Sequence, residues 1–211
     1  MRRTSDLYGG QTHAQRRQER RSRFVRAAFD IWRESGWAAV TMRKVCAQTT
    51  LNTRYFYEDF SDRDDLLVAV WEGIRAELLA ALLDVVALDP ERPPLETLSQ
   101  ALRTLVTWVA DDLPRAHVLL GAHTGCPALE KKRQASQREL IELMIDTGSP
   151  HLRADADPDA FRVDVTIGLH GFTGMLSEWH SGALALTEAQ VVDHVTRLAS
   201  TIASQHIKTA D

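Results

Sequence analysis

The chain has 211 residues, of which 44% are hydrophobic and 26% charged, the balance of a globular protein with a sizeable core. No apolar run is long enough to cross a bilayer, and the first twenty residues are too polar for a secretory signal. Cys46 and Cys126 lie far apart without metal-ligand spacing, so we expect a reduced, cytoplasmic protein with no cofactor and no membrane partner.

The net charge of −4 conceals an uneven distribution along the chain. Residues 1–65 carry 13 Lys and Arg against 9 Asp and Glu, whereas residues 66–211 carry 12 against 20. A basic amino-terminal part on an acidic body is typical of a protein that meets a polyanion with one end only.

The chain begins with a predicted arm and a long basic helix. Residues 1–12 contain turn formers without periodicity, which predicts a flexible arm. Residues 13–35 show apolar side chains at helical spacing, and Gly36 is suited to ending that helix. Arginines crowd its first half: Arg16, Arg17, Arg20, Arg21 and Arg23. These like charges repel one another unless something anionic lies near.

The stretch from Thr41 to Phe60 predicts two short helices joined by a tight turn. Thr41 is a good N-cap for the first helix, and Asn52 is a good N-cap for the second. This is the layout of a helix-turn-helix, whose second helix enters the major groove of DNA. A surface helical hairpin with aromatic anchors is the alternative. Phe56 and Phe60 should pack against Phe24 and Ile31 in a small three-helix core.

The order of these elements resembles the amino-terminal domain of the TetR family of one-component transcriptional regulators. The resemblance covers residues 20–67, from the basic helix through the Tyr-Phe-Tyr core of the third helix to FSDRDDLL, which starts the next. This sequence departs from the family pattern in two places. Thr50 stands where the turn usually carries glycine, and Asn52, Thr53 and Arg54 replace the usual opening of the second short helix.

The resemblance implies DNA contacts from this module. Thr41, Tyr57 and Arg63 match positions that clamp the phosphate backbone in the family. Thr53 and Arg54 open the recognition helix, where Arg54 can read guanine or contact a phosphate, and both roles stay open. The expected DNA-binding residues are Arg20, Thr41, Arg43, Asn52, Thr53, Arg54, Tyr55, Tyr57 and Arg63.

The remainder predicts helices throughout, with no strand signal. The expected helices cover about residues 62–88, 95–109, 114–120, 127–148, 158–179 and 187–202. Asp157-Pro158 is a strong start for the fifth of these, and Thr187 with Gln190 makes a capping box at the start of the last. We therefore predict an all-α protein of about nine helices in three parts. A flexible arm spans residues 1–12, a helix-turn-helix DNA-binding domain spans 13–65, and a helical ligand-binding and dimerisation domain spans 66–211.

Catalytic and metal chemistry find little support. The chain has no His-Glu-x-x-His or Glu-x-x-His motif, so we expect no enzyme. The glycines at 168, 171 and 174 fall within a predicted helix and follow no strand, which argues against a nucleotide loop. Nothing fixes the geometry of the four histidines that could converge on a metal, which are His117, His123, His170 and His180. We predict no metal site.

The family resemblance further implies a ligand cavity and a homodimer. The residues expected near the cavity are Trp108, His117, Phe161, His170, Phe172 and Met175, with ordinary core packing as the alternative. Such walls suit a small, mostly apolar ligand with one or two hydrogen-bonding groups. The last two helices should form the dimer interface through Trp179, Val191, Val195, Leu198 and Ile202.

The predicted function is that of a TetR-like repressor, which binds a palindromic double-stranded DNA operator as a homodimer and is controlled by a small molecule. One short recognition helix contacts too few bases for operator specificity, so two half-sites are needed. The alternative is a helical interaction or scaffolding protein that does not bind DNA.

Overall fold

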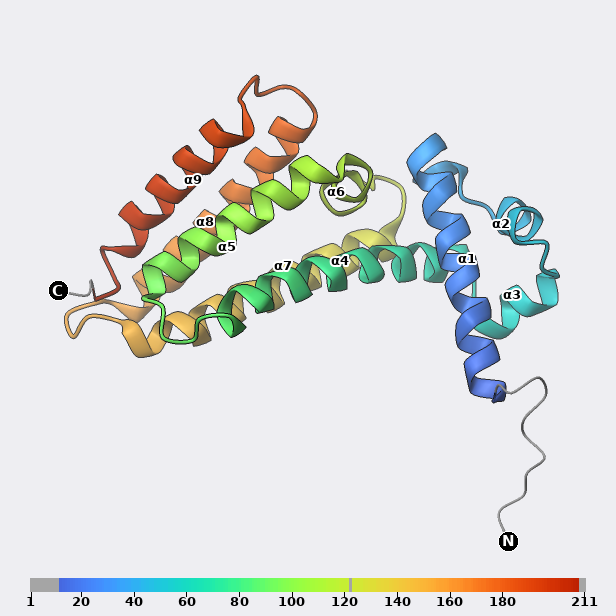
Figure 1. The fold of residues 1–211 in the computed structure, drawn as a ribbon, viewed down its shortest axis with the longest axis horizontal. Coiled ribbons are helices and arrows are strands. Elements are labelled where there is room, and N and C mark those ends of the chain that lie inside the picture. The colour runs from blue at the N-terminus through green and yellow to red at the C-terminus, as the bar shows by residue number, and fades with distance from the viewer. Residues whose placement is uncertain (1–11, 122, 209–211) are drawn as a thin grey trace, which may run out of the picture. The chain divides into compact units, whose positions relative to one another are not determined.

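The computed structural model describes residues 12–121 and 123–208 (Figure 1). Within these ranges the chain forms nine α-helices and two 3₁₀ turns, and its one β feature is an isolated bridge between Leu152 and Ile207. The all-α prediction is therefore confirmed. The predicted arm lies outside the described residues except for Thr12.

The helices follow the caps and apolar spacing of the sequence. Their bounds are α1 (His13–Ser35), α2 (Met42–Thr49), α3 (Thr53–Asp59), α4 (Arg63–Ala87), α5 (Pro94–Asp111), α6 (Leu113–Leu120), α7 (Pro127–Gly148), α8 (Pro158–His180) and α9 (Glu188–Ala203), with η1 (Trp37–Ala39) and η2 (Ser149–His151) between them. None of the described helices is long and apolar enough to span a membrane.

The chain divides into two compact units. Of the described residues, the first unit holds 12–73 and 123–130, and the second holds 74–121 and 131–208. Helix α4 begins in the first unit and ends in the second.

The first unit is a small helical core around three phenylalanines. Phe24 of α1 meets Phe56 of α3 edge to face at 5.7 Å between ring centroids, and it meets Phe60 at 6.2 Å. All three rings are fully buried, as the sequence predicts. Edge-to-face pairs add specific geometry to the apolar area they bury, so this cluster fixes where α3 lies against α1.

The segment 123–130 completes this core from far along the chain. His123, Cys126 and Leu129 are all buried in the first unit. The His123 ring lies edge-on to Trp32 with 5.3 Å between centroids. The first unit therefore depends on residues that follow α6 as well as on the amino-terminal helices.

The second unit has its own core, made mainly by α5, α6, α8 and α9. Helix α5 runs beside α9, and α6 packs on α8 (Figure 1). The buried cluster consists of Val106, Val109, Ala116, Leu176, Val191 and Val192. Helix α9 begins at a capping box, in which the Thr187 hydroxyl accepts from the backbone of Gln190, as predicted.

Candidate nucleic-acid interface

The turn between α2 and α3 is made by a residue in the left-handed region. Thr50 has φ 56° and ψ 26°, the one positive φ outside glycine among residues 12–121 and 123–208. Its amide donates to the carbonyl of Ala47 at 3.3 Å, and the Leu51 amide donates to Cys46 at 3.2 Å. These bonds close α2 in a tight turn although a β-branched side chain is disfavoured there.

Helix α3 is seven residues long and buries one face. Phe56 fills the core, whereas the Arg54 side chain is 84% exposed. Tyr57 is 61% exposed and rests edge-on against Phe56 at 5.6 Å. The exposed face of α3 therefore offers a guanidinium and a phenol, which suit the bases and phosphates of a duplex.

The two N-cap residues hold the helix starts and keep spare donors. The Thr41 hydroxyl oxygen accepts from the Lys44 amide at 3.3 Å. The Asn52 side-chain oxygen accepts from the Arg54 amide at 2.9 Å and from the Thr53 hydroxyl at 3.2 Å. The hydroxyl hydrogen of Thr41 and the amide hydrogens of Asn52 can therefore still be donated to a phosphate.

The arginine cluster of α1 is directed at the carboxyl end of α3. Asp59 has a fully buried side chain, and its carboxylate accepts from Arg17 Nε at 3.0 Å and from Arg20 Nε at 2.7 Å. Arg21 donates to the Asp59 carbonyl, and Arg23 donates to another carbonyl at the end of α2. Arg17 and Arg20 therefore find their anionic partner within the module.

The electrostatics of this cluster are dominated by Asp59. Burial by itself raises the pKa of the Asp59 carboxyl, but hydrogen bonds and charge from Arg20 and Arg17 outweigh burial and lower that pKa. The hydrogen bond to Asp59 likewise raises the pKa of Arg20. The guanidinium of Arg20 also lies 4.7 Å from the centre of the Tyr55 ring. Arg20 is thus placed between α1 and α3, on the inner side of the module.

Arg63 is also bound within the module. Its Nε donates to the Val40 carbonyl at 2.6 Å, and Nη2 donates to the Trp37 carbonyl at 2.8 Å. These bonds hold η1 against the start of α4. Arg43 and Lys44, in contrast, are exposed on α2. Lys44 is a candidate contact that the predicted set leaves out, although the same outward spacing on α2 indicates it.

The sequence of residues 24–70 matches the model of the family described as bacterial regulatory proteins, tetR family. Residues 24–70 are a TetR-family helix-turn-helix module.

Solved structures extend the TetR likeness over most of the chain. A transcriptional regulator from Rhodococcus sp. RHA1 aligns with a TM-score of 0.72 at 16% identity, covering 90% of this chain and 99% of that one. The SmeT–triclosan complex gives 0.68 at 19% identity, with 92% and 94% covered. A TetR-like regulator, also from Rhodococcus sp. RHA1, gives 0.63 at 20%, with 88% and 94% covered. No curated protein matches the chain by sequence.

In the second unit of this TetR-like fold, the expected ligand residues lie in separate environments. Trp108, Phe172 and Met175 pack against the α5–α9 core. Phe161 is buried elsewhere on α8, with its ring 5.5 Å from that of His206. His117 is exposed at the end of α6, 5.7 Å from the ring of His180. Burial and then the neighbouring His117 lower the pKa of His180.

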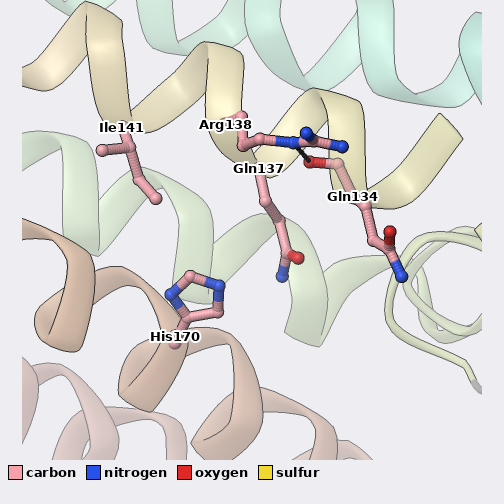
Figure 2. A pocket seen from close by; sticks show the side chains of 5 residues that line it. All are labelled: Gln134, Gln137, Arg138, Ile141 and His170. Atoms are coloured by element: carbon pink, nitrogen blue, oxygen red, sulfur yellow. Dashed lines mark hydrogen bonds between the residues drawn. The ribbon is translucent and has the colours of Figure 1, made fainter. Parts of the chain in front are cut away.

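His170, one of the expected ligand residues, lines a pocket between α7 and α8. This open pocket of about 280 Å³ is lined by Gln134, Gln137, Arg138, Ile141 and His170 (Figure 2). Gln137 and His170 point toward each other across it, while Arg138 lies along α7 and donates to a carbonyl of its own helix. His170 Nδ1 lies 2.8 Å from the Thr166 carbonyl, which can only accept. Nδ1 therefore carries the proton, and in the neutral ring Nε2 is an acceptor.

The expected dimer residues differ in exposure. Val191 is buried, and Trp179 donates its indole N–H to the Leu186 carbonyl at 2.8 Å inside the second unit. Val195 and Ile202 are half-buried, and Leu198 is 62% exposed. Over the part of the chain that the structure describes, no three His, Cys, Asp or Glu side chains are grouped to hold a metal ion.

Proposed function

We propose that this TetR-family protein is a transcriptional repressor that binds a palindromic DNA operator as a homodimer and responds to a small ligand. The observation that carries the proposal is the exposed face of α3, which presents Arg54 and Tyr57 to solvent. We assign DNA binding to residues 13–65, and ligand binding and dimerisation to residues 66–211.

The residues of the interface take two roles in this proposal. Arg43, Thr53, Arg54, Tyr55 and Tyr57 are exposed and contact the duplex directly, together with the cap residues Thr41 and Asn52. Arg20 and Arg63 hold α3 and η1 in place through bonds within the module. A guanidinium that reads guanine through O6 and N7 contributes about 1–3 kcal/mol of discrimination, which we assign to Arg54.

A salt-titrated gel shift with genomic fragments tests DNA binding. We expect the logarithm of affinity to fall linearly with the logarithm of salt concentration, because phosphate contacts release counterions. Arg54→Ala should weaken selected duplexes, whereas Arg153→Ala, which removes the same charge from an exposed position outside α8 and α9, should leave binding unchanged. A protein that shifts no duplex even at low salt would instead be a helical interaction or scaffolding protein.

The proposed homodimer follows from the size of the recognition element. A seven-residue helix reaches few bases, and a second copy placed about 34–36 Å away supplies the other half-site. Exposed apolar residues on the last two helices support an interface there, among them Leu198 of α9 and Ile167 of α8. Burial of such an apolar side chain against a partner subunit lowers the free energy of the dimer.

The proposed ligand binds between α7 and α8 in the pocket of Figure 2. Four of its five lining residues are polar, so we propose a small molecule with several hydrogen-bonding groups, in place of the mostly apolar ligand that the sequence predicts. Two side-chain amides offer donors and acceptors, and the Nε2 of His170 offers a further polar contact. Thermal-shift screening of metabolites against wild type and Gln137→Ala tests this site; a hit whose shift survives the substitution binds elsewhere.

A further inference from the structure

Glu58 lies one helical turn after Arg54 on α3 and is bound on both carboxylate oxygens. Arg54 Nε lies 3.2 Å from Oε1, and Arg20 Nη2 lies 3.1 Å from Oε2. A single exposed pair at this spacing contributes little, because both side chains lose rotamer freedom to form it. The bond from Arg20 lowers this entropy cost, because it already restricts the rotamers of the Glu58 side chain to which Arg54 binds.

Arg20 is itself fixed. Only 18% of its side chain is exposed, and two of its nitrogens donate to the fully buried carboxylate of Asp59, at 2.7 and 3.0 Å. The guanidinium also lies over the Tyr55 ring. A chain of alternating charges therefore runs from the buried Asp59 through Arg20 and Glu58 to the exposed Arg54, and each bond limits the freedom of the next side chain.

We propose that Glu58 is a positioning residue that orients Arg54 for base readout; this inference rests on the proposed DNA binding. Glu58 accepts a hydrogen bond from Nε of Arg54, so both terminal nitrogens of Arg54 remain for base contacts. These two nitrogens are the pair that suits O6 and N7 of guanine. A side chain held in its productive geometry by a supporting hydrogen bond reads its target with less ordering cost.

The charge of Glu58 adds a second, opposite effect. A carboxylate near the duplex repels phosphates, so it weakens binding to any sequence while it sharpens the choice among sequences. Removing Glu58 should therefore raise affinity for random DNA and lower the preference for guanine. A residue that merely stabilised the fold would lower both.

The experiment compares Glu58→Gln and Glu58→Ala by selection of preferred sites and by quantitative binding. For Glu58→Ala we expect the guanine preference at one position of each half-site to fall about twofold to fivefold, the range of one exposed pair. Glu58→Gln should fall less, because the amide oxygen still accepts from Arg54. Glu19→Gln removes the same charge from an exposed position of α1 and should leave the guanine preference unchanged.

A double-mutant cycle decides whether Glu58 acts through Arg54. Adding Glu58→Ala to Arg54→Ala should cause no further loss of guanine preference. An additional loss of the same size as in wild type would overturn the inference, as would an unchanged base preference in Glu58→Ala or in Arg54→Ala. These outcomes leave DNA binding itself intact, whereas a wild-type protein that binds no duplex refutes the proposed function.

Discussion

Replacing Asp59 tests how the module holds its recognition helix. The buried carboxylate accepts three hydrogen bonds, one from Arg17 and two from Arg20. Hydrogen bonds to charged groups contribute about 1.5–3 kcal/mol each when they are buried, and an ion that loses its buried partner costs more. Because Arg20 is mostly buried but not fully desolvated, we expect Asp59→Ala to destabilise the first unit by about 2–4 kcal/mol.

The two arginines should contribute unequally. The Arg17 side chain is 56% exposed, so water screens its bond to Asp59 and Arg17→Ala should cost about 0.5 kcal/mol. Arg20 is 18% exposed and makes two of the three bonds, so Arg20→Ala should cost about 2 kcal/mol. The order Asp59→Ala, then Arg20→Ala, then Arg17→Ala follows from burial and from the number of bonds that each side chain makes to the other.

The pH dependence has a definite sign. The folded state lowers the pKa of Asp59, so the carboxylate contributes stability that is fully present above its ordinary pKa of about 3.9. That contribution is lost as pH falls through the lower pKa of the folded protein. The difference in stability between wild type and Asp59→Asn should therefore be constant near neutral pH and close only below about pH 4.

Urea unfolding measures the change in the free energy of unfolding for each variant. Because the two units can unfold separately, amide hydrogen exchange at α3 assigns that change to the first unit. If Arg17→Ala costs as much as Arg20→Ala, the argument from burial is wrong. If the difference between wild type and Asp59→Asn persists unchanged to pH 3, ionised Asp59 does not supply the stability.

Two further predictions concern the turn and the dimer. Thr50→Gly should stabilise the protein by about 0.5–1 kcal/mol in thermal melts, because removing a β-branched side chain from the left-handed region outweighs the entropy cost of glycine. The control Thr201→Gly, within α9, should destabilise the protein. A loss of stability in both variants would refute the strain at Thr50. Leu198→Glu should give monomers with intact helicity and weak operator binding, measured by light scattering, circular dichroism and gel shift, and a wild-type protein that is monomeric at micromolar concentration would contradict the homodimer.

Local signals in the sequence determined the helices and the core of the first unit. Threonine and asparagine caps, the Asp157-Pro158 start and glycine after α1 act within one turn of their own position, so they can be read without the fold. The apolar pattern of the sequence likewise predicted that the rings of Phe24, Phe56 and Phe60 are buried.

The partners of charged side chains were decided by the tertiary structure. The arginines of α1 predict an anionic partner, but Asp59 lies about forty positions further on and meets Arg20 only because α1 and α3 pack around the phenylalanines. The same packing binds Arg63 to the carbonyls of η1. Sequence spacing identifies a charge, whereas its nearest counter-charge depends on contacts between distant segments.

Burial of an apolar residue was readable from the sequence, but its neighbours were not. Phe161 and Met175 lie on the same helix, yet one packs beside His206 and the other on the α5–α9 core. His123 joins the first unit although it follows α6. Hydrophobic burial is non-directional, so an apolar stripe on a helix predicts that a side chain is buried. Which residues that side chain contacts depends on the arrangement of the other helices.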